Sequence, residues 1–137
     1  LTVSSRRQQL LTPDRGTRVE QKILHLLANV QADGSQPLAE VMMGTLLQLR
    51  RGMTLCLITG STERDWIRAL ASLRRRGVGT IVVLVDRASF VGRDDDESRA
   101  QLAAARHALA EYDVTHHLVR AGDQLVDALG GRERVRA

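Results

Sequence analysis

Apolar side chains in the first part of the chain recur every three or four residues, which is the spacing of a helix with one buried face. A first helix is predicted by the stripe Val19, Ile23, Leu26, Leu27 and Val30. Thr17 and Glu20 have the spacing of a capping box at its start. A second helix is predicted to start at Pro37, which suits the first turn of a helix, and to stop at Gly52. Its apolar stripe consists of Leu38, Val41, Met42, Thr45, Leu46 and Leu49.

The residues before the first helix predict a β-hairpin. Segments 1–5 and 8–12 alternate imperfectly between apolar and polar side chains, and Arg6 and Arg7 lie between them. Residues 13–16, with the sequence Pro-Asp-Arg-Gly, are typical of a loop.

After Met53 the pattern changes to alternating strands and helices. Residues 55–58 and 80–85 are short, continuous apolar runs, which are typical of parallel strands buried on both faces. The helix between them is predicted to begin at a Ser61 or Thr62 cap and to end at Gly77. Its apolar stripe consists of Trp66, Ile67, Leu70 and Leu73.

Two more helices and one more strand complete the pattern. A helix is predicted over 97–112, with Leu102, Ala105, Leu109 and Tyr112 facing inward. Residues 114–119 predict a strand at the edge of the sheet, because it carries His116 and His117. Asp123 is the predicted cap of a last short helix that contains Leu125, Val126 and Leu129 and ends at Gly130.

Together these elements predict an α/β fold with a mostly parallel, Rossmann-like sheet in three layers, with helices on both faces. The length of 137 residues indicates a single domain. It comprises a hairpin (1–12), two helices (17–52), alternating strands and helices (53–130) and a tail (131–137). Because Leu1 is not an initiator Met, we expect the chain to be a fragment of a longer protein.

Composition narrows the classes of function. The single cysteine, Cys56, excludes a disulfide framework and a Cys-rich zinc site. Although the net charge is +4, aromatic residues make up only 2%, so nothing indicates stacking platforms for nucleic acid. The densest basic cluster, Arg74 to Arg76, ends a predicted helix, where cations suit the helix dipole. The sequence contains neither an apolar run long enough to insert into a membrane nor a secretory signal at its start. We therefore expect a cytoplasmic location.

Candidate binding residues lie where predicted parallel strands end, since ligands of open α/β sheets bind there. Thr59, Gly60, Ser61 and Thr62 join a strand to a helix N-terminus and are either an anion site or an ordinary helix cap. Asp86 follows the next strand and either ligates a metal ion, orients a substrate or caps the following turn. For the turn at 59–62 and for Asp86, capping is the preferred interpretation.

Other polar groups carry weaker signals. Asp94, Asp95 and Asp96 precede a helix and are predicted to be a solvated helix start. His116 and His117 are adjacent on a strand and point to opposite faces, so they cannot share a metal ion. Cys56 lies in a strand predicted to be buried, where a thiol is inert. No GxGxxG, P-loop or GxSxG pattern occurs, and no metal or cofactor is predicted.

An ordered set of short segments covers nearly the whole chain and resembles the C-terminal part of the bacterial domain-of-unknown-function fifty-eight family. The segments are residues 13–16 (PDRG), 23–30 (ILHLLANV), 37–40 (PLAE), 51–59 (RGMTLCLIT), 65–66 (DW), 76–78 (RGV), 86–90 (DRASF) and 119–123 (VRAGD). Proteins of this family carry a von Willebrand factor A-like domain and are often encoded beside MoxR-type AAA+ ATPases.

The resemblance implies a sheet that binds proteins through a metal-ion-dependent adhesion site built from three loops. Its first loop, DxSxS, would lie upstream of Leu1, together with the central first strand of the sheet. Ser35 stands where the second loop supplies a Thr, and Gly60 stands where the third loop supplies an Asp. We therefore expect no metal ion to bind this chain.

The resulting hypothesis is a non-enzymatic protein-interaction module that cooperates with a MoxR-type AAA+ ATPase, with Ser35, Thr59, Gly60, Ser61, Thr62 and Asp86 as candidate contact residues. The alternative is an α/β hydrolase that binds a nucleotide or phosphate ester through residues 59–62 and Asp86. The missing central strand predicts an open sheet edge and a homodimer, unless the hairpin fills the vacant place. The full-length protein would be anchored to a membrane, if at all, through an upstream segment.

Overall fold

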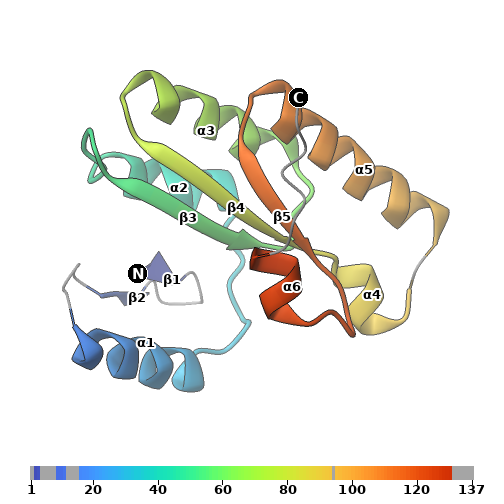
Figure 1. The fold of residues 1–137 in the computed structure, drawn as a ribbon, viewed down its shortest axis with the longest axis horizontal. Helices are drawn as coiled ribbons and strands as arrows, with labels where there is room; N and C mark the ends of the chain where they lie inside the picture. The colour runs from blue at the N-terminus through green and yellow to red at the C-terminus, as the bar shows by residue number, and fades with distance from the viewer. Residues whose placement is uncertain (1, 4–8, 12–15, 94, 131–137) are drawn as a thin grey trace. The chain divides into compact units, whose positions relative to one another are not determined.

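The computed structural model describes residues 2–3, 9–11, 16–93 and 95–130, and its chain divides into two compact units, Leu1–Thr45 and Leu46–Ala137 (Figure 1). The elements of the first unit are β1 (Thr2–Val3), β2 (Gln9–Leu10), α1 (Thr17–Asn29) and α2 (Leu38–Leu46), whose last residue belongs to the second unit. Those of the second are β3 (Thr54–Thr59), α3 (Arg64–Arg75), β4 (Gly79–Val85), α4 (Arg87–Val91), α5 (Asp96–Glu111), β5 (Thr115–Val119) and α6 (Leu125–Gly130).

In the first unit, β1 and β2 pair antiparallel, with Thr2 opposite Leu10 and Val3 opposite Gln9. This confirms the predicted hairpin, while the turn with Arg6 and Arg7 lies outside the described residues, as does most of the loop at 13–16. The predicted capping box is wrong, because Thr17 is already inside α1 and Gly16 occupies the N-cap with φ of 107° and no side-chain cap bond.

Helix α2 ends earlier than the sequence predicts. Its stripe from Leu38 to Leu49 is buried or half-buried as expected, but the last helical residue is Leu46 and Leu47 is 85% exposed. The Arg76 guanidinium donates hydrogen bonds to the carbonyls of Leu46 at 3.0 Å and Leu49 at 3.2 Å. These bonds satisfy carbonyls that a longer helix would satisfy internally.

The second unit is an α/β fold around a parallel sheet with the order β3-β4-β5, the coarse arrangement of a Rossmann-like fold. Both crossovers step in the same direction across the sheet, so the right-handed rule places α3 and α5 on one face. The two helices pack against each other, α3 also against β4 and α5 against β5. The fully buried large side chains of this layer are Trp66, Ile67, Leu70, Leu73, Val82, Leu84 and Leu109.

The predicted coverage of both sheet faces is wrong over β3. Side chains alternate along this strand, with Leu55, Leu57 and Thr59 half-buried on the helix face. Thr54, Cys56 and Ile58 point to the other face and are exposed, Ile58 to 70%. Cys56 is therefore an exposed thiol on an edge strand rather than a buried one. The apolar run predicted the strand correctly, but the placement of both long helices on one face decides its burial.

The ends of the later helices also differ from the sequence prediction. Tyr112 is the C-cap of α5 and is 39% exposed, although Leu102, Ala105 and Leu109 are buried as predicted. Helix α6 has no buried residue. Asp123 does not cap it, because its carboxylate accepts a hydrogen bond from the Arg120 N–H at 2.8 Å and closes the turn before the helix. None of the described helices has the length and apolar character needed to cross a membrane.

Asp95 provides a pH-dependent contribution to stability. As the N-cap of α5, its carboxylate accepts a hydrogen bond from the Ser98 backbone N–H at 2.7 Å, and this bond is the main cause that lowers the pKa of Asp95 below its ordinary value of 3.8. A lowered pKa in the folded state stabilises the fold above the unfolded pKa, and the contribution is lost as pH falls through the folded value.

We therefore expect Asp95→Ala to melt at a lower temperature than wild type at about pH 7, with the difference shrinking below the ordinary pKa of 3.8. Thermal unfolding followed by circular dichroism between about pH 2 and about pH 7 measures this difference. Asp95→Asn is the control, because its amide oxygen accepts the same bond at every pH. A difference between Asp95→Ala and wild type that is constant with pH would contradict the assignment.

Candidate functional site

The carboxyl ends of β3, β4 and β5 meet at one end of the sheet, where α4 and α6 begin (Figure 1). Asp86 follows β4 and is the most buried charged residue of the described chain, with 9% of its surface exposed. One carboxylate oxygen accepts a hydrogen bond from the Ser89 N–H at 3.4 Å and thereby caps α4. The other lies 3.3 Å from the Arg120 Nε. Both oxygens of Asp86 therefore have partners within the protein.

Ser89 and Arg120 complete this cluster, which we call the Asp86 cluster. The Ser89 hydroxyl donates to the Asp86 carbonyl at 2.7 Å and accepts from the Ala121 N–H at 3.0 Å. The Asp86 N–H donates to the Val119 carbonyl at 2.9 Å. Together these bonds join the residues that follow β4 to those that follow β5. The predicted capping role of Asp86 is confirmed, and the cluster gives it a second structural role.

The turn after β3 forms bonds within itself. The Thr59 hydroxyl accepts a hydrogen bond from the Ser61 N–H at 3.0 Å, and the Ser61 hydroxyl accepts one from the Glu63 N–H at 3.3 Å. Neither Ser61 nor Thr62 caps α3, whose N-cap is Glu63 without a side-chain cap bond. The predicted helix cap is therefore wrong in its residue, because the N-cap lies two residues after Ser61 and one after Thr62.

Gly60 lies where another side chain passes close to the backbone. A Cβ atom at this position would lie 2.4 Å from the Cγ and 2.5 Å from the Cδ of Arg87. The aliphatic stem of Arg87 therefore lies against the turn after β3. A larger residue at position 60 would displace Arg87.

The structure brings Thr59, Gly60, Ser61, Thr62 and Asp86 to one end of the sheet in the second unit, as the sequence predicted. Ser35 lies in the first unit, exposed in the loop between α1 and α2. A surface hollow in the first unit contains none of these residues; it is lined by Leu11, Arg18, Gln21, Lys22, His25, Leu26 and Asn29. Across the described ranges, no group of three or more His, Cys, Asp or Glu side chains is arranged to hold a metal ion.

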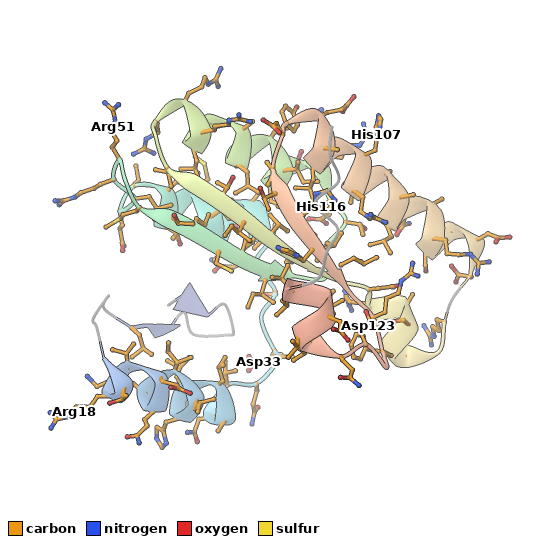
Figure 2. The ribbon with its side chains drawn as sticks, viewed as in Figure 1. Arg18, Asp33, Arg51, His107, His116 and Asp123 are labelled. Carbon is orange, nitrogen blue, oxygen red and sulfur yellow. The ribbon has the colours of Figure 1, made fainter. Side chains whose placement is uncertain are left out.

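Of the three histidines of the second unit, His107 lies on α5, whereas His116 and His117 lie on β5; Figure 2 labels His107 and His116. His107 Nε2 lies 3.5 Å from a Glu111 carboxylate oxygen on the same helix. His116 Nδ1 lies 3.1 Å from the carbonyl of Val114. His116 and His117 occupy successive positions of β5 and so point to opposite faces, as predicted.

Sequence reasoning did not assign a role to Ser89 or Arg120. The signal was nevertheless present, because Asp86 and Arg120 each follow a predicted parallel strand, and parallel neighbours end at the same edge. An acid and a base in these positions predict an ion pair once the order of the strands is known. That order became available only from the tertiary structure.

The same end of the sheet also presents apolar side chains to solvent. Exposed large residues on the two short helices are Phe90 and Val91 on α4 and Leu125, Val126 and Leu129 on α6, with exposed fractions from 42% to 82%. We call this set the α4–α6 surface. The sequence predicted a short helix that carries the three α6 residues, and the structure shows that none of them is buried. Comparison of the chain with protein-family models, curated proteins and solved structures finds no match.

Proposed function

We propose that this chain is a non-enzymatic protein-interaction module that binds its partner through the α4–α6 surface. The observation that carries the proposal is the exposure of five large apolar side chains on two short helices, with Val126 exposed to 82%. The bonds of the Asp86 cluster join the start of α4 to Arg120 and Ala121, in the segment that precedes α6. Clustered exposed apolar side chains are typical of protein contact sites, since water contact with them is costly.

The alternative, a hydrolase for a nucleotide or phosphate ester, receives less support. Its candidate groups are the turn at 59–62 and Asp86. The Thr59 and Ser61 hydroxyls accept backbone hydrogen bonds, and both oxygens of Asp86 have protein partners. A substrate would have to displace these bonds, which favours a structural role for the same residues.

The resemblance to the domain-of-unknown-function fifty-eight family supports a MoxR-type AAA+ ATPase as the partner. In this proposal the second unit is part of a von Willebrand A-like domain, and its parallel sheet with crossover helices is compatible with that assignment. The partner would offer an apolar patch complementary to the α4–α6 surface. The module would act with the ATPase in the assembly or maturation of other proteins.

Binding of the immobilised chain to a purified MoxR-type ATPase tests the proposal. We expect Val126→Glu to weaken binding at least about tenfold, because a carboxylate would be buried in an apolar contact. Leu47→Glu is the matched control, since Leu47 is equally exposed, at 85%, but lies outside the α4–α6 surface. Its affinity should stay within about twofold of wild type.

Two results would contradict this function. One is equal binding by wild type and Val126→Glu, which would exclude the α4–α6 surface as the contact. The other is a rise in melting temperature with a nucleotide or phosphate ester that Ser61→Ala abolishes, which would support the hydrolase alternative.

A further inference from the structure

Two turns of the second unit are bonded to each other at the amino ends of β3 and β4. Residues 50–53 precede β3, and residues 76–78 join α3 to β4. The Gly52 N–H donates a hydrogen bond to the Gly77 carbonyl at 3.0 Å. Both glycines have a positive φ, 87° and 76°, which allows each turn to be sharp. Because β3 and β4 are parallel, the two turns lie at the end of the sheet opposite the Asp86 cluster.

Five exposed arginines belong to these turns and to the end of α3 that leads into the second turn. They are Arg50, Arg51, Arg74, Arg75 and Arg76. A Cβ atom at Gly77 would lie 2.8 Å from the Cγ of Arg51, so the stem of Arg51 lies against the other turn. Figure 2 shows the Arg51 side chain extending from its turn away from the strands. Two basic segments that are separate in the sequence therefore share one surface.

Only two of the five arginines have partners that explain them. Arg74 forms an ion pair with Asp113. Arg76 donates to the carbonyls of Leu46 and Leu49. The guanidinium groups of the other three, which we call the amino-end arginines, form no hydrogen bond or ion pair with a described residue: Arg50, Arg51 and Arg75. Two of these three lie beyond the last turn of α2, where a helix dipole no longer attracts a cation, so their charge has no structural use in the described chain.

Exposed apolar side chains accompany these arginines in the segment before β3. Leu47 is 85% exposed and Met53 is 40% exposed. Guanidinium groups bind phosphate oxygens in a bidentate manner, in lipid headgroups as in nucleic acids. A nucleic-acid backbone has no apolar layer behind its phosphates, whereas a bilayer has acyl chains directly beneath its headgroups. The combination of unpaired arginines and exposed apolar side chains therefore favours a lipid surface.

We propose that the amino-end arginines bind the phosphate headgroups of an anionic phospholipid surface, with Leu47 and Met53 at the boundary between headgroups and acyl chains. The negative surface potential attracts each arginine over about one Debye length, so the contact is reversible and weakens with salt. The proposal does not rest on the α4–α6 surface, because α4 and α6 follow the carboxyl ends of β4 and β5. A chain bound to lipid through the amino ends of the strands keeps that surface free for a protein partner.

Co-sedimentation of the chain with vesicles measures this binding. We compare phosphatidylcholine vesicles with vesicles that also contain about one-third phosphatidylserine, at up to about 10 mM lipid. At about 0.1 M salt, wild type should bind the anionic vesicles at least about tenfold more tightly, and about 0.5 M salt should release it. The triple variant Arg50→Gln, Arg51→Gln and Arg75→Gln should bind the anionic vesicles at least about tenfold more weakly than wild type, because each arginine contributes about fivefold near such a surface.

A matched control removes the same charge from another part of the second unit. Arg64, Arg68 and Arg106 are exposed on α3 and α5, and replacing all three by glutamine lowers the net charge by the same amount. This control variant should bind the anionic vesicles within about threefold of wild type. Circular dichroism melting of both triple variants confirms that each retains the fold.

Three results would overturn the proposal. The first is equal binding of wild type to vesicles with and without phosphatidylserine. The second is an equal loss in both triple variants, which would assign the binding to net charge rather than to the amino-end arginines. The third is binding to duplex DNA at the same salt without binding to vesicles, which would assign these arginines to a nucleic acid. Binding to the ATPase should be unchanged in the amino-end variant, so this proposal and the proposed function can fail separately.

Discussion

Trp66→Ala is expected to lower the free energy of unfolding by about 3–5 kcal/mol, the typical cost of removing a fully buried tryptophan. Trp66 has no exposed surface and lies on α3 beside the equally buried Ile67. Replacing the indole by a methyl group leaves a cavity that close-packed neighbours fill only in part. Because domains of this size are stable by about 5–15 kcal/mol, the variant would lose a large share of its stability.

Urea denaturation followed by far-ultraviolet circular dichroism measures this loss, since the variant lacks the only tryptophan for fluorescence. Leu47→Ala is the control for loss of an apolar side chain at an exposed position, and should change stability by less than about 0.5 kcal/mol. A Trp66→Ala variant with wild-type stability would show that the helix face is not packed as described.

Trp66→Phe refines the same experiment. The Nε1 of Trp66 is buried without a hydrogen-bond partner among the described residues. Phenylalanine keeps most of the apolar contact and removes a donor whose burial is costly, so this variant should lose clearly less stability than Trp66→Ala. Equal losses in both variants would mean that the indole N–H has a partner.

The second large effect is expected at the Asp86 cluster. Asp86→Ala should lower the free energy of unfolding by about 1–3 kcal/mol, since it removes the cap of α4 and the ion pair with Arg120. The Arg120 side chain is 53% exposed, so solvent screening keeps the contribution of the ion pair small. Most of the loss should therefore come from the cap.

Two further variants separate these contributions. Asp86→Asn keeps an oxygen that accepts from the Ser89 N–H but loses the charge, so its loss should approach that of Arg120→Gln. In a double-mutant cycle, Asp86→Asn and Arg120→Gln should couple by about 0.5–1 kcal/mol. If Asp86→Ala instead raised stability, the carboxylate would be a strained functional group, as the hydrolase alternative requires.

Local pattern was sufficient to predict most of the elements. The apolar runs at 55–58 and 80–85 predicted β3 and β4, and the stripe of Leu102, Ala105 and Leu109 predicted α5 and its buried face. These predictions hold because the period of apolar positions follows directly from the backbone geometry of a strand or helix. Helix starts were less predictable at Thr17 and Ser61, because the observed N-caps, Gly16 and Glu63, make no side-chain cap bond and so follow no capping pattern in the sequence.

The sequence predicted where the candidate site residues lie but not the hydrogen bonds and the ion pair that they form. Strand ends identified Asp86 and the turn at 59–62, since parallel strands bring their carboxyl ends together. A partner distant in sequence, Arg120, decides whether the Asp86 carboxylate oxygens are free to bind a ligand. No local sequence pattern specifies such a pair. The apolar residues of α6 show the same limit, because apolar side chains on a predicted helix do not indicate whether another element covers them.

The sequence by itself therefore determined the α/β class, the parallel strands and the order of elements along the chain except α4, which it did not predict. Only the tertiary structure decided which surfaces are buried. Strand order β3-β4-β5 with right-handed crossovers puts both long helices on one face, which leaves Cys56 and Ile58 exposed. It also places β3 at an edge and brings Arg120 to Asp86. Burial and strand pairing depend on which elements are neighbours in space. The spacing of apolar residues along the chain identifies the apolar face of an element but not the element that packs against it.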